Sequence, residues 1–394
     1  MRHIDDDERR SRLAVRHALT AGHRAADAVE ATRAMTVLHA TEAPSPHLSV
    51  WARVDGITRG DIDRALYDDR SLVKQLAMRR TLFVFPRDLL PAAWGSASAR
   101  VAGQHATRLA KDAEQGGIAS DGAAWLEAAR SAVLTRLSDG SELSAQALRE
   151  QVPELSGRIE VAPGKPYGGS FPIAPRVLTQ LSVEGLIVRG HNGSHWRVSR
   201  PLWTSMTAWL GDSPEPWPAR EGFAELVRRW LRSFGPGTTA DIQWWLGATA
   251  GIVRTALADV EAAEVALDAG ESGWVLPDDL DPVDPVEPWA AILPVLDPTV
   301  MGWKTRAFYL GPHAESVFDS NGNAGATAWW DGRIVGCWWQ DDTGAVLLHL
   351  LEDVGRDGRA ALEVEAARLS AWLEGDVVPT LYTAPAIRGA RSAR

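Results

Sequence analysis

The sequence contains a single cysteine, Cys337, and no long apolar run. One cysteine excludes an intramolecular disulfide framework and leaves no paired-cysteine pattern for a zinc site. Because a membrane-spanning helix needs about 18 consecutive apolar residues, we expect no membrane association. The N-terminal segment Met1–Glu8 is charged and unlike a signal peptide. Together these absences predict a cytoplasmic protein.

The chain also lacks the net positive charge common among nucleic-acid-binding proteins, since its formal net charge is −10. Eight acidic residues, and no Lys or Arg, lie between Asp268 and Val300. Without these eight of the 51 acidic residues, the charge would be −2. The acidic charge is therefore partly local, and basic patches elsewhere remain available to bind DNA.

Tryptophan is unusually abundant, with 18 Trp against 4 Tyr. Many of them occur as neighbours, namely Trp244-Trp245, Trp329-Trp330 and Trp338-Trp339. We interpret most of them as core residues. Base stacking by a few is the alternative.

The first 285 residues repeat one local order three times: helices, a short helix pair, and two strands joined by a turn. In the first copy we expect short helices at residues 49–54 and 59–66. Strands are expected at 72–77 and 81–85, with Arg79-Arg80 near their turn.

The second copy carries the clearest hairpin signal of the chain. A helix at 172–184 ends at Gly185, as a helix C-cap would. Strands at 186–189 and 195–198 then flank Asn192-Gly193, a strong tight-turn pair.

The third copy is predicted to be mainly helical, and the C-terminal region is predicted to consist mainly of strands. In the third copy we expect helices at 223–234, 239–246 and 251–259, followed by strands at 264–267 and 274–276. In the C-terminal region we expect strands at 291–296, 307–310, 327–330, 334–339, 346–350 and 377–382, and a helix at 359–373.

A helix-turn-helix followed by a β-hairpin is the layout of a winged helix. We therefore predict an α+β fold of three tandem winged helices, at residues 1–88, 89–211 and 212–285. A C-terminal β-barrel-like domain is predicted at 286–394. Nucleic acid is the natural target of such a tandem, although winged helices also serve protein contacts or structural roles.

Four stretches, in order along nearly the whole chain, resemble the AlkZ-like winged-helix DNA glycosylases, the azinomycin-resistance type of self-resistance enzyme. These stretches are Val37–Glu42 with Leu48–Arg53; Arg79–Asp88; Leu231–Gly247; and Leu293–Pro298 with Asp331–Trp338. The resemblance implies a C-shaped bacterial protein that binds duplex DNA and hydrolyses the N-glycosidic bond of N7-alkylated purines. It also implies that the enzyme needs no metal. We predict a monofunctional enzyme with no cofactor and no obligate protein partner.

The family's catalytic motif, which is Gln, an apolar residue, then Gln or Asp, falls on His39-Ala40-Thr41. Both polar positions therefore depart from the family pattern. In an extended segment these two side chains share a face, and they keep the hydrogen-bonding capacity of two amides. We predict His39 and Thr41 as catalytic residues, with Glu42 as a third candidate. The alternative is that they are ordinary polar residues at a helix end.

Basic side chains on the predicted wings and loops are candidates for DNA phosphate contacts. They are Arg53, Arg79, Arg80, Arg176, Arg189, Arg197, Lys304 and Arg306. For each of them, an ion pair or a solvated surface position is the alternative interpretation.

The leading hypothesis is a DNA glycosylase that releases bulky N7-alkylguanine adducts, in genotoxin self-resistance or alkylation repair. The second hypothesis is a non-catalytic winged-helix protein that binds DNA or a genotoxin, because both family glutamines are absent. A transcription regulator is the third, and the C-terminal region, which resembles neither a sensor domain nor a dimerisation zipper, argues against it.

Overall fold

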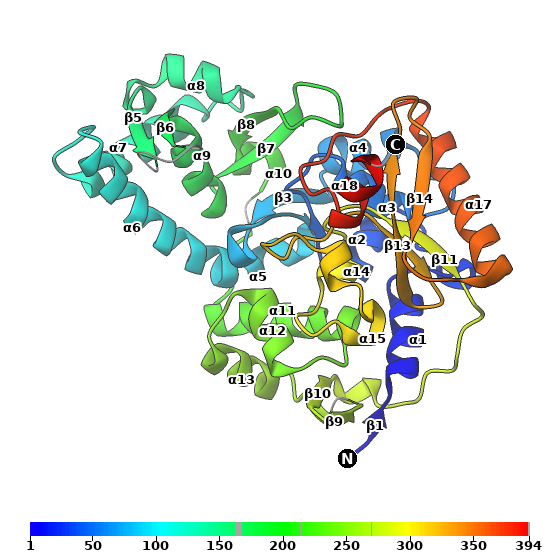
Figure 1. Ribbon diagram of the computed structural model, residues 1–394. Helices are drawn as coiled ribbons and strands as arrows, with labels where there is room; N and C mark the ends of the chain where they lie inside the picture. The colour runs from blue at the N-terminus through cyan, green and yellow to red at the C-terminus, as the bar shows by residue number, and fades with distance from the viewer. Residues whose placement is uncertain (162–167, 213, 269, 393–394) are drawn as a thin grey trace.

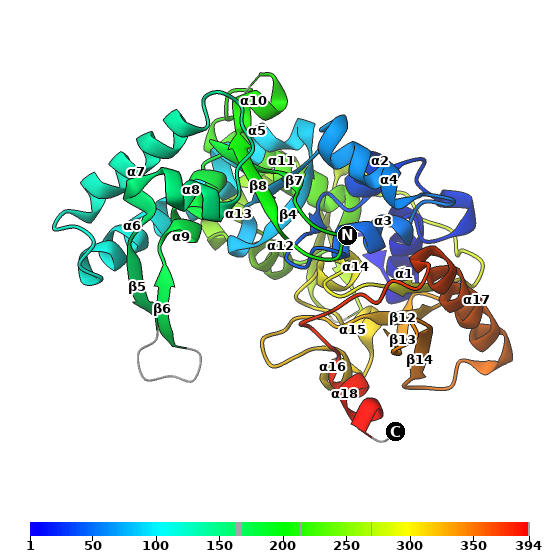
Figure 2. The same ribbon diagram turned by 90° about the horizontal axis from the view of Figure 1, so that it is seen from above.

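The computed structural model describes residues 1–161, 168–212, 214–268 and 270–392. Within these ranges the chain is a mixture of helices and short strands, and the strands form five small sheets. Figures 1 and 2 show the elements arranged as an open arch. One end of the arch is a lobe formed by residues 99–183, and the other end is formed by residues 314–392. The predicted α+β class is therefore confirmed.

The N-terminal segment carries short helices around one small antiparallel sheet. Its elements are β1 (His3–Ile4), α1 (Asp6–Arg16), α2 (Ala28–Ala34), β2 (Leu38–His39), α3 (Ser45–Trp51), α4 (Arg59–Asp63), β3 (Leu72–Leu76) and β4 (Leu82–Pro86). The sheet order is β2-β4-β3. Its central strand is covered on both faces, because Phe83, Val84 and Phe85 are all buried. The strand pair expected at 72–77 and 81–85 is confirmed.

The lobe has a hydrophobic core separate from the main core. It follows α5 (Leu90–Ala93) and contains α6 (Ala99–Gln115), α7 (Gly122–Arg136), α8 (Ala145–Gln151), β5 (Arg158–Val161), β6 (Gly169–Pro172) and α9 (Ala174–Val183). It is followed by β7 (Ile187–Asn192), β8 (Pro201–Ser205) and α10 (Met206–Leu210). Its core includes Leu109, Val133 and Leu181. The main core runs from Leu13 to Ile387. The domain boundaries and the number of winged helices stay predictions.

The hairpin of β7 and β8 differs from the one expected. Its strands are joined by a loop of residues 193–200 and not by a tight turn, so the strand expected at 195–198 is wrong. The Asn192 side-chain amide donates to three backbone carbonyls within this loop, which stabilises the wider turn. Trp196 leaves the hairpin to contact Trp372, with the ring centroids 5.8 Å apart. Tertiary packing therefore overrides the local turn signal.

The third copy of the pattern is confirmed element by element. It consists of α11 (Ala219–Phe234), α12 (Thr239–Leu246), α13 (Ala250–Asp259), β9 (Ala263–Leu267) and β10 (Ser272–Val275). Thr238 and Asp241 form a reciprocal capping box at the start of α12. The short strand β1 joins β9 in parallel, so the N-terminus completes this small sheet.

The C-terminal region contains an open four-stranded sheet, in the order β11-β12-β13-β14. Its elements are β11 (Ala290–Leu293), α14 (Pro298–Met301), α15 (Ala307–Leu310), α16 (Ala314–Val317), β12 (Thr327–Trp330), β13 (Arg333–Gln340), β14 (Val346–Leu350), α17 (Gly355–Leu373) and α18 (Pro385–Ser392). No closed barrel forms among the described strands. The strand expected at 307–310 is the helix α15, which ends at Gly311 with φ 55°. The segment expected as a strand at 377–382 pairs with no described strand.

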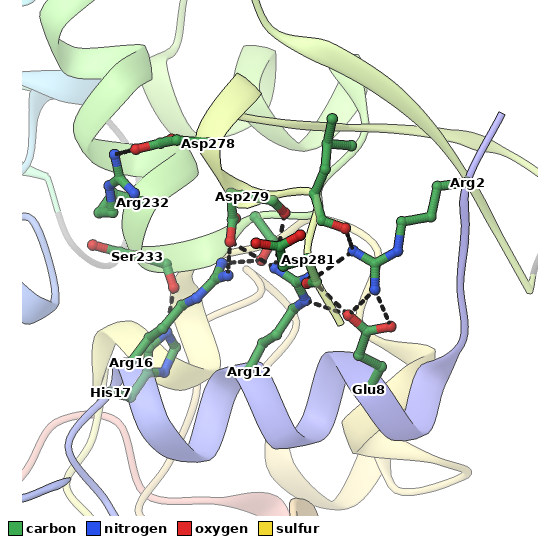
Figure 3. Close-up of polar contacts among 12 residues, drawn as sticks. Arg2, Glu8, Arg12, Arg16, His17, Arg232, Ser233, Asp278, Asp279 and Asp281 are labelled. Carbon is green, nitrogen blue, oxygen red and sulfur yellow. Dashed lines mark hydrogen bonds and ion pairs between the residues drawn. The ribbon is translucent and has the colours of Figure 1, made fainter. Parts of the chain in front are cut away.

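Part of the acidic stretch is neutralised by arginines from two helices (Figure 3). Arg12 and Arg16 of α1 both contact Asp279, at 2.8 and 2.5 Å. Arg232 of α11 pairs with Asp278 at 2.8 Å. The Arg12 side chain is almost fully buried, so its pairing with Asp279 and Glu8 compensates a desolvated charge. The local acidity seen in the sequence thus serves to attach this stretch to α1 and α11.

A second buried ion pair joins the N-terminal segment to the C-terminal region. Arg53, which follows α3, donates to both carboxylate oxygens of Asp297, at 2.8 and 2.9 Å, and neither side chain is exposed. Ser49 and Thr299 complete the network, and His17, the residue after α1, contacts the Thr299 hydroxyl at 3.0 Å. Burial alone would raise the pKa of Asp297, but Arg53 and these hydrogen bonds hold it below its usual range. The pair is therefore charged in the folded protein.

We expect Arg53→Ala to lower the free energy of unfolding by about 3–5 kcal/mol, because it leaves the Asp297 carboxylate buried and unpaired. The double variant Arg53→Met/Asp297→Leu should be more stable than Arg53→Ala, since it removes both charges. Urea denaturation followed by circular dichroism measures both effects. Arg359→Ala, on an exposed position of α17, is the control. An Arg53→Ala protein as stable as this control would contradict the assigned role.

Candidate active site and DNA-binding surface

The predicted catalytic motif begins in β2, an edge strand of its sheet. His39 pairs in register with Phe83 of β4, and the Ala40 N–H donates to the Leu82 carbonyl at 2.9 Å. His39 is buried, its ring lies 4.7 Å from that of Phe83, and its Nδ1 has no hydrogen-bond partner among the described residues. Burial, aided by the charge of Arg79, lowers the pKa of His39 to about 3. The imidazole is therefore neutral at pH 7.

Thr41 lies two residues further on, in a bend, and its side chain is exposed. The extended backbone expected around the motif is present at His39 but ends before Thr41. The two side chains consequently lie in different surroundings, one buried and one at the surface. Their shared catalytic role stays a prediction.

Glu42 is buried beneath residues 376–384, a segment we call the C-terminal strap. Its Oε1 accepts hydrogen bonds from the Leu381 N–H at 2.5 Å and from the Thr380 hydroxyl at 3.0 Å. Its Oε2 has no partner among the described residues. Burial raises the pKa of Glu42, although the hydrogen bonds from the strap oppose this effect. Sequence reasoning identified Glu42 but not the strap that covers it.

A cavity of about 330 Å³ lies beside Glu42, between α3, the four-stranded sheet and the strap. Its lining includes Glu42, Leu48, Val295, Trp338, Val378 and Ala384. This is the size range of small-molecule pockets, and the walls combine apolar side chains with polar ones, among them Gln340, Asp342 and Thr383. The pocket is therefore large enough for a purine base with a substituent.

The strap is held from its other side by the loop of residues 193–200. The Trp196 indole N–H donates to the Asp376 carboxylate at 3.0 Å, and Arg197 lies 3.4 Å from the same group. Arg197 also donates to the Val377 carbonyl. The Arg197 guanidinium is thus engaged within the protein. Arg197 lies in the loop, whereas the sequence predicted it on a wing strand.

Two further predicted DNA contacts have different surroundings from those expected. The prediction for Arg53 is wrong, because its side chain is fully buried in the ion pair with Asp297 and cannot reach a phosphate. Arg189 lies on β7, as expected, but packs over the Trp203 ring at 4.8 Å. Burial lowers the pKa of Arg189 to about 10.

Arg80 and Arg176 are brought together, although 96 positions separate them in the sequence. With His105 and Arg108 they line a concavity of about 460 Å³ on the lobe side of the β3–β4 hairpin. Asp112 is the one carboxylate in this lining and pairs with Arg176. The surplus of basic groups gives this surface the charge that an anionic ligand requires.

The remaining basic candidates lie around α12. Arg79 and Arg306 both lie over the ring of Trp244, at 4.0 and 5.0 Å, although 227 positions separate them. Lys304 is exposed on the loop that leads to Arg306. Sequence reasoning found the arginines but assigned Trp244 no role, because only its adjacency to Trp245 was visible.

Two features of the described residues bear on cofactors and membranes. No group of three or more His, Cys, Asp or Glu side chains is arranged to hold a metal ion in the described ranges. None of the described helices is long and apolar enough to cross a membrane. Independence from metals stays a prediction.

The model of one protein family, described as DNA glycosylase AlkZ-like, matches residues 32–372. The chain belongs to the AlkZ-like DNA glycosylase family. A comparison with curated proteins gives no match. Among solved structures, the chain is similar to the Streptomyces sahachiroi DNA glycosylase AlkZ, with a TM-score of 0.71 and 19% identity. The match covers 96% of this chain and 99% of that one, so the two share a fold over their full lengths.

Family membership makes DNA the substrate and base release the reaction class. We expect the His39 imidazole not to titrate between pH 5 and 8 in the folded protein, because burial lowers its pKa to about 3. Histidine NMR spectra, assigned with the His39→Gln variant, measure this. In urea the same signal should titrate near 6.5.

The lowered pKa of His39 also makes the free energy of unfolding depend on pH. Below about pH 6.5 the unfolded chain binds a proton at His39 that the folded protein does not. The contribution of His39 to the free energy of unfolding should therefore fall as the pH decreases from 6.5 towards 3. A His39 midpoint above pH 6 in the folded protein would refute the buried, neutral state.

Proposed function

We propose that the protein is a monofunctional DNA glycosylase that hydrolyses the N-glycosidic bond of bulky N7-alkylguanine in duplex DNA. The observation that carries this proposal is the family match across residues 32–372, which includes the motif position at His39-Ala40-Thr41. The basic surfaces around Arg80 and Arg79 support duplex DNA as the ligand. No obligate protein partner is part of the proposal.

The chemistry of the substrate limits what the protein must supply. An N7-alkylated guanine is cationic and leaves as a neutral base, so departure needs neither a metal nor a strong acid. What remains is to position a water molecule against the sugar and to stabilise an oxocarbenium-like transition state. Neutral His39 offers one donor and one acceptor for this water, and its Nδ1 is unpartnered among the described residues. Thr41 supplies a second hydroxyl contact.

Glu42 is the third group in this proposal. Its carboxylate lies three positions from His39, beside the 330 Å³ cavity. In its ionised form, a carboxylate there would stabilise positive charge developing on the sugar. The raised pKa of Glu42 favours the protonated form, so its ionisation would make base release faster as the pH increases.

The biological role we infer is genotoxin self-resistance or alkylation repair in the bacterial cytoplasm, where chromosomal DNA lies. A non-catalytic protein that binds DNA or a genotoxin is the second candidate. It is favoured by one observation: His39 is buried while Thr41 is exposed, so the motif side chains do not share one environment. Release of the damaged base distinguishes the two candidates.

The test is incubation with duplex DNA that contains 7-methylguanine or a bulkier N7 adduct, followed by alkaline cleavage at abasic sites. We expect His39→Ala to reduce base release about a hundredfold, the cost of one positioned hydrogen-bonding group at a transition state. Thr41→Ala should cost less, because another water can take part of the role of a hydroxyl. His39→Gln should retain activity, since it restores the family residue.

DNA affinity, measured on undamaged duplex, is the control for these variants and should stay near the wild-type value. Base release by His39→Ala at the wild-type rate would exclude catalysis by His39. Absence of base release from every N7 adduct by the wild-type protein would exclude the glycosylase and leave the binding protein.

A further inference from the structure

The hairpin between β3 and β4 turns through two consecutive arginines in the left-handed region. Arg79 has φ 54° and Arg80 has φ 60°. Residues with a Cβ atom rarely adopt this conformation, and tight hairpin turns prefer Asn and Gly for this reason. Local strain of this kind persists where the surrounding structure enforces it, and it concentrates at functional sites. Two adjacent arginines in this position therefore need an explanation.

The strained turn directs its two arginines to different surroundings. Arg80 lines the concavity shared with His105 and Arg176 on the lobe. Arg79 instead lies over Trp244 of α12, with its guanidinium carbon 4.0 Å from the ring centroid. Gly247, the left-handed C-cap of α12, lies close to this side chain, and a Cβ atom there would be 3.1 Å from the Arg79 Cγ. The end of α12 therefore packs closely against Arg79.

A second arginine reaches the same indole from the C-terminal region. Arg306 lies 5.0 Å from the Trp244 ring and 4.4 Å from the Phe318 ring. Cation–π contacts of this kind hold a guanidinium in place without neutralising its charge. Trp244 therefore brings two cations together from distant parts of the chain.

Neither arginine forms an ion pair with a carboxylate among the described residues, although Arg306 also has the Tyr309 hydroxyl as a hydrogen-bond partner. The Nε and one Nη of Arg79, and the Nε of Arg306, are buried without a hydrogen-bond partner in the described ranges. Burial, then the charge of Arg306, lowers the pKa of Arg79 to about 10. Two desolvated like charges destabilise the protein on their own, and an anion between them would reverse this effect.

Asp241, the carboxylate on the same helix as Trp244, cannot supply that anion. Asp241 of α12 accepts hydrogen bonds from the backbone N–H groups of Lys304 and Thr305, at 2.9 and 2.7 Å. Its other oxygen accepts from Thr238 at the start of the helix. Asp241 therefore fixes the loop that carries Arg306, and its carboxylate pairs with neither guanidinium group.

We propose that Arg79 and Arg306, which both lie over the ring of Trp244, form a clamp for one backbone phosphate of duplex DNA. Guanidinium groups match phosphate oxygens in geometry and bind them through paired hydrogen bonds. The clamp lies near the motif, because the Ala40 N–H donates to the carbonyl of Leu82, three positions after Arg79 in the same hairpin. Trp244 is a positioning residue in this arrangement, since it contacts the arginines and not the phosphate. This inference rests on the proposed function for its ligand, the DNA substrate.

The test measures the affinity of the full-length protein for undamaged duplex DNA by fluorescence anisotropy at several salt concentrations. The slope of log affinity against log salt reports the number of phosphate contacts. We expect Arg79→Gln and Arg306→Gln each to weaken binding by about tenfold at low salt, the loss of hydrogen bonds to a charged group. The salt slope should decrease by about 0.9 when the phosphate contact is lost.

The tryptophan provides a readout that a purely structural role would not give. Trp244→Phe should keep the wild-type affinity and slope, because a phenyl ring also supports a guanidinium. Trp244→Ala should resemble the arginine variants in both quantities. Arg359→Gln, which removes one exposed arginine from α17, is the matched control and should leave both unchanged. If Trp244→Ala fails to fold, the two arginine variants carry the test.

The outcomes separate the clamp from the proposed function. A lower affinity with an unchanged salt slope would overturn the clamp, as would wild-type affinity in Arg79→Gln and Arg306→Gln. Base release from 7-methylguanine DNA is measured in parallel. A wild-type protein that shows the expected slopes but releases no base would refute the glycosylase and support the clamp. Base release with slopes insensitive to the arginines would refute the clamp alone.

Discussion

The buried pair of Arg53 and Asp297 is the contact on which the rest of the molecule depends. It fixes α3, which follows the His39 motif, against the turn that begins the C-terminal region. The same carboxylate caps α14 through the Thr299 N–H. A buried charge pair tolerates little displacement, because any separation leaves a desolvated charge uncompensated. The motif and the C-terminal sheet are therefore held in a fixed relative position.

Charge is used in two distinct ways in this acidic protein. Arginines in the interior are paired, as Arg12 is with Asp279 and Arg53 is with Asp297. Arg79 and Arg306 are held by aromatic rings instead, and among the described residues they form no ion pair. The net charge therefore says little about DNA binding, because most acidic groups near α1 and α11 are engaged by arginines. What matters is where cations are left without carboxylates.

Sequence reasoning predicted elements well where local signals and tertiary packing agree. The third copy was predicted well because the apolar period of α11, the stop at Gly235 and the threonine N-cap of α12 indicate the boundaries that the structure has. The strand predicted at residues 195–198 was wrong, because Trp196 packs on Trp372, and no local pattern reveals that contact. Sequence reasoning also misjudged Arg53, since a basic residue after a helix looks the same whether its partner is a phosphate or Asp297. The position of Glu42 was visible, but its cover by the strap depends on contacts across more than 330 residues.

The strap is synthesised much later than the Glu42 that it covers. Glu42 is synthesised early, yet its partners Thr380 and Leu381 follow 338 and 339 positions later. At 5–20 residues per second, this interval is about 20–70 s. Throughout it the Glu42 carboxylate has neither of these partners, and one wall of the neighbouring cavity is missing. A ribosome-bound chain can thus fold its N-terminal helices while this cavity is still incomplete, which separates the folding of the N-terminal segment from the completion of the cavity.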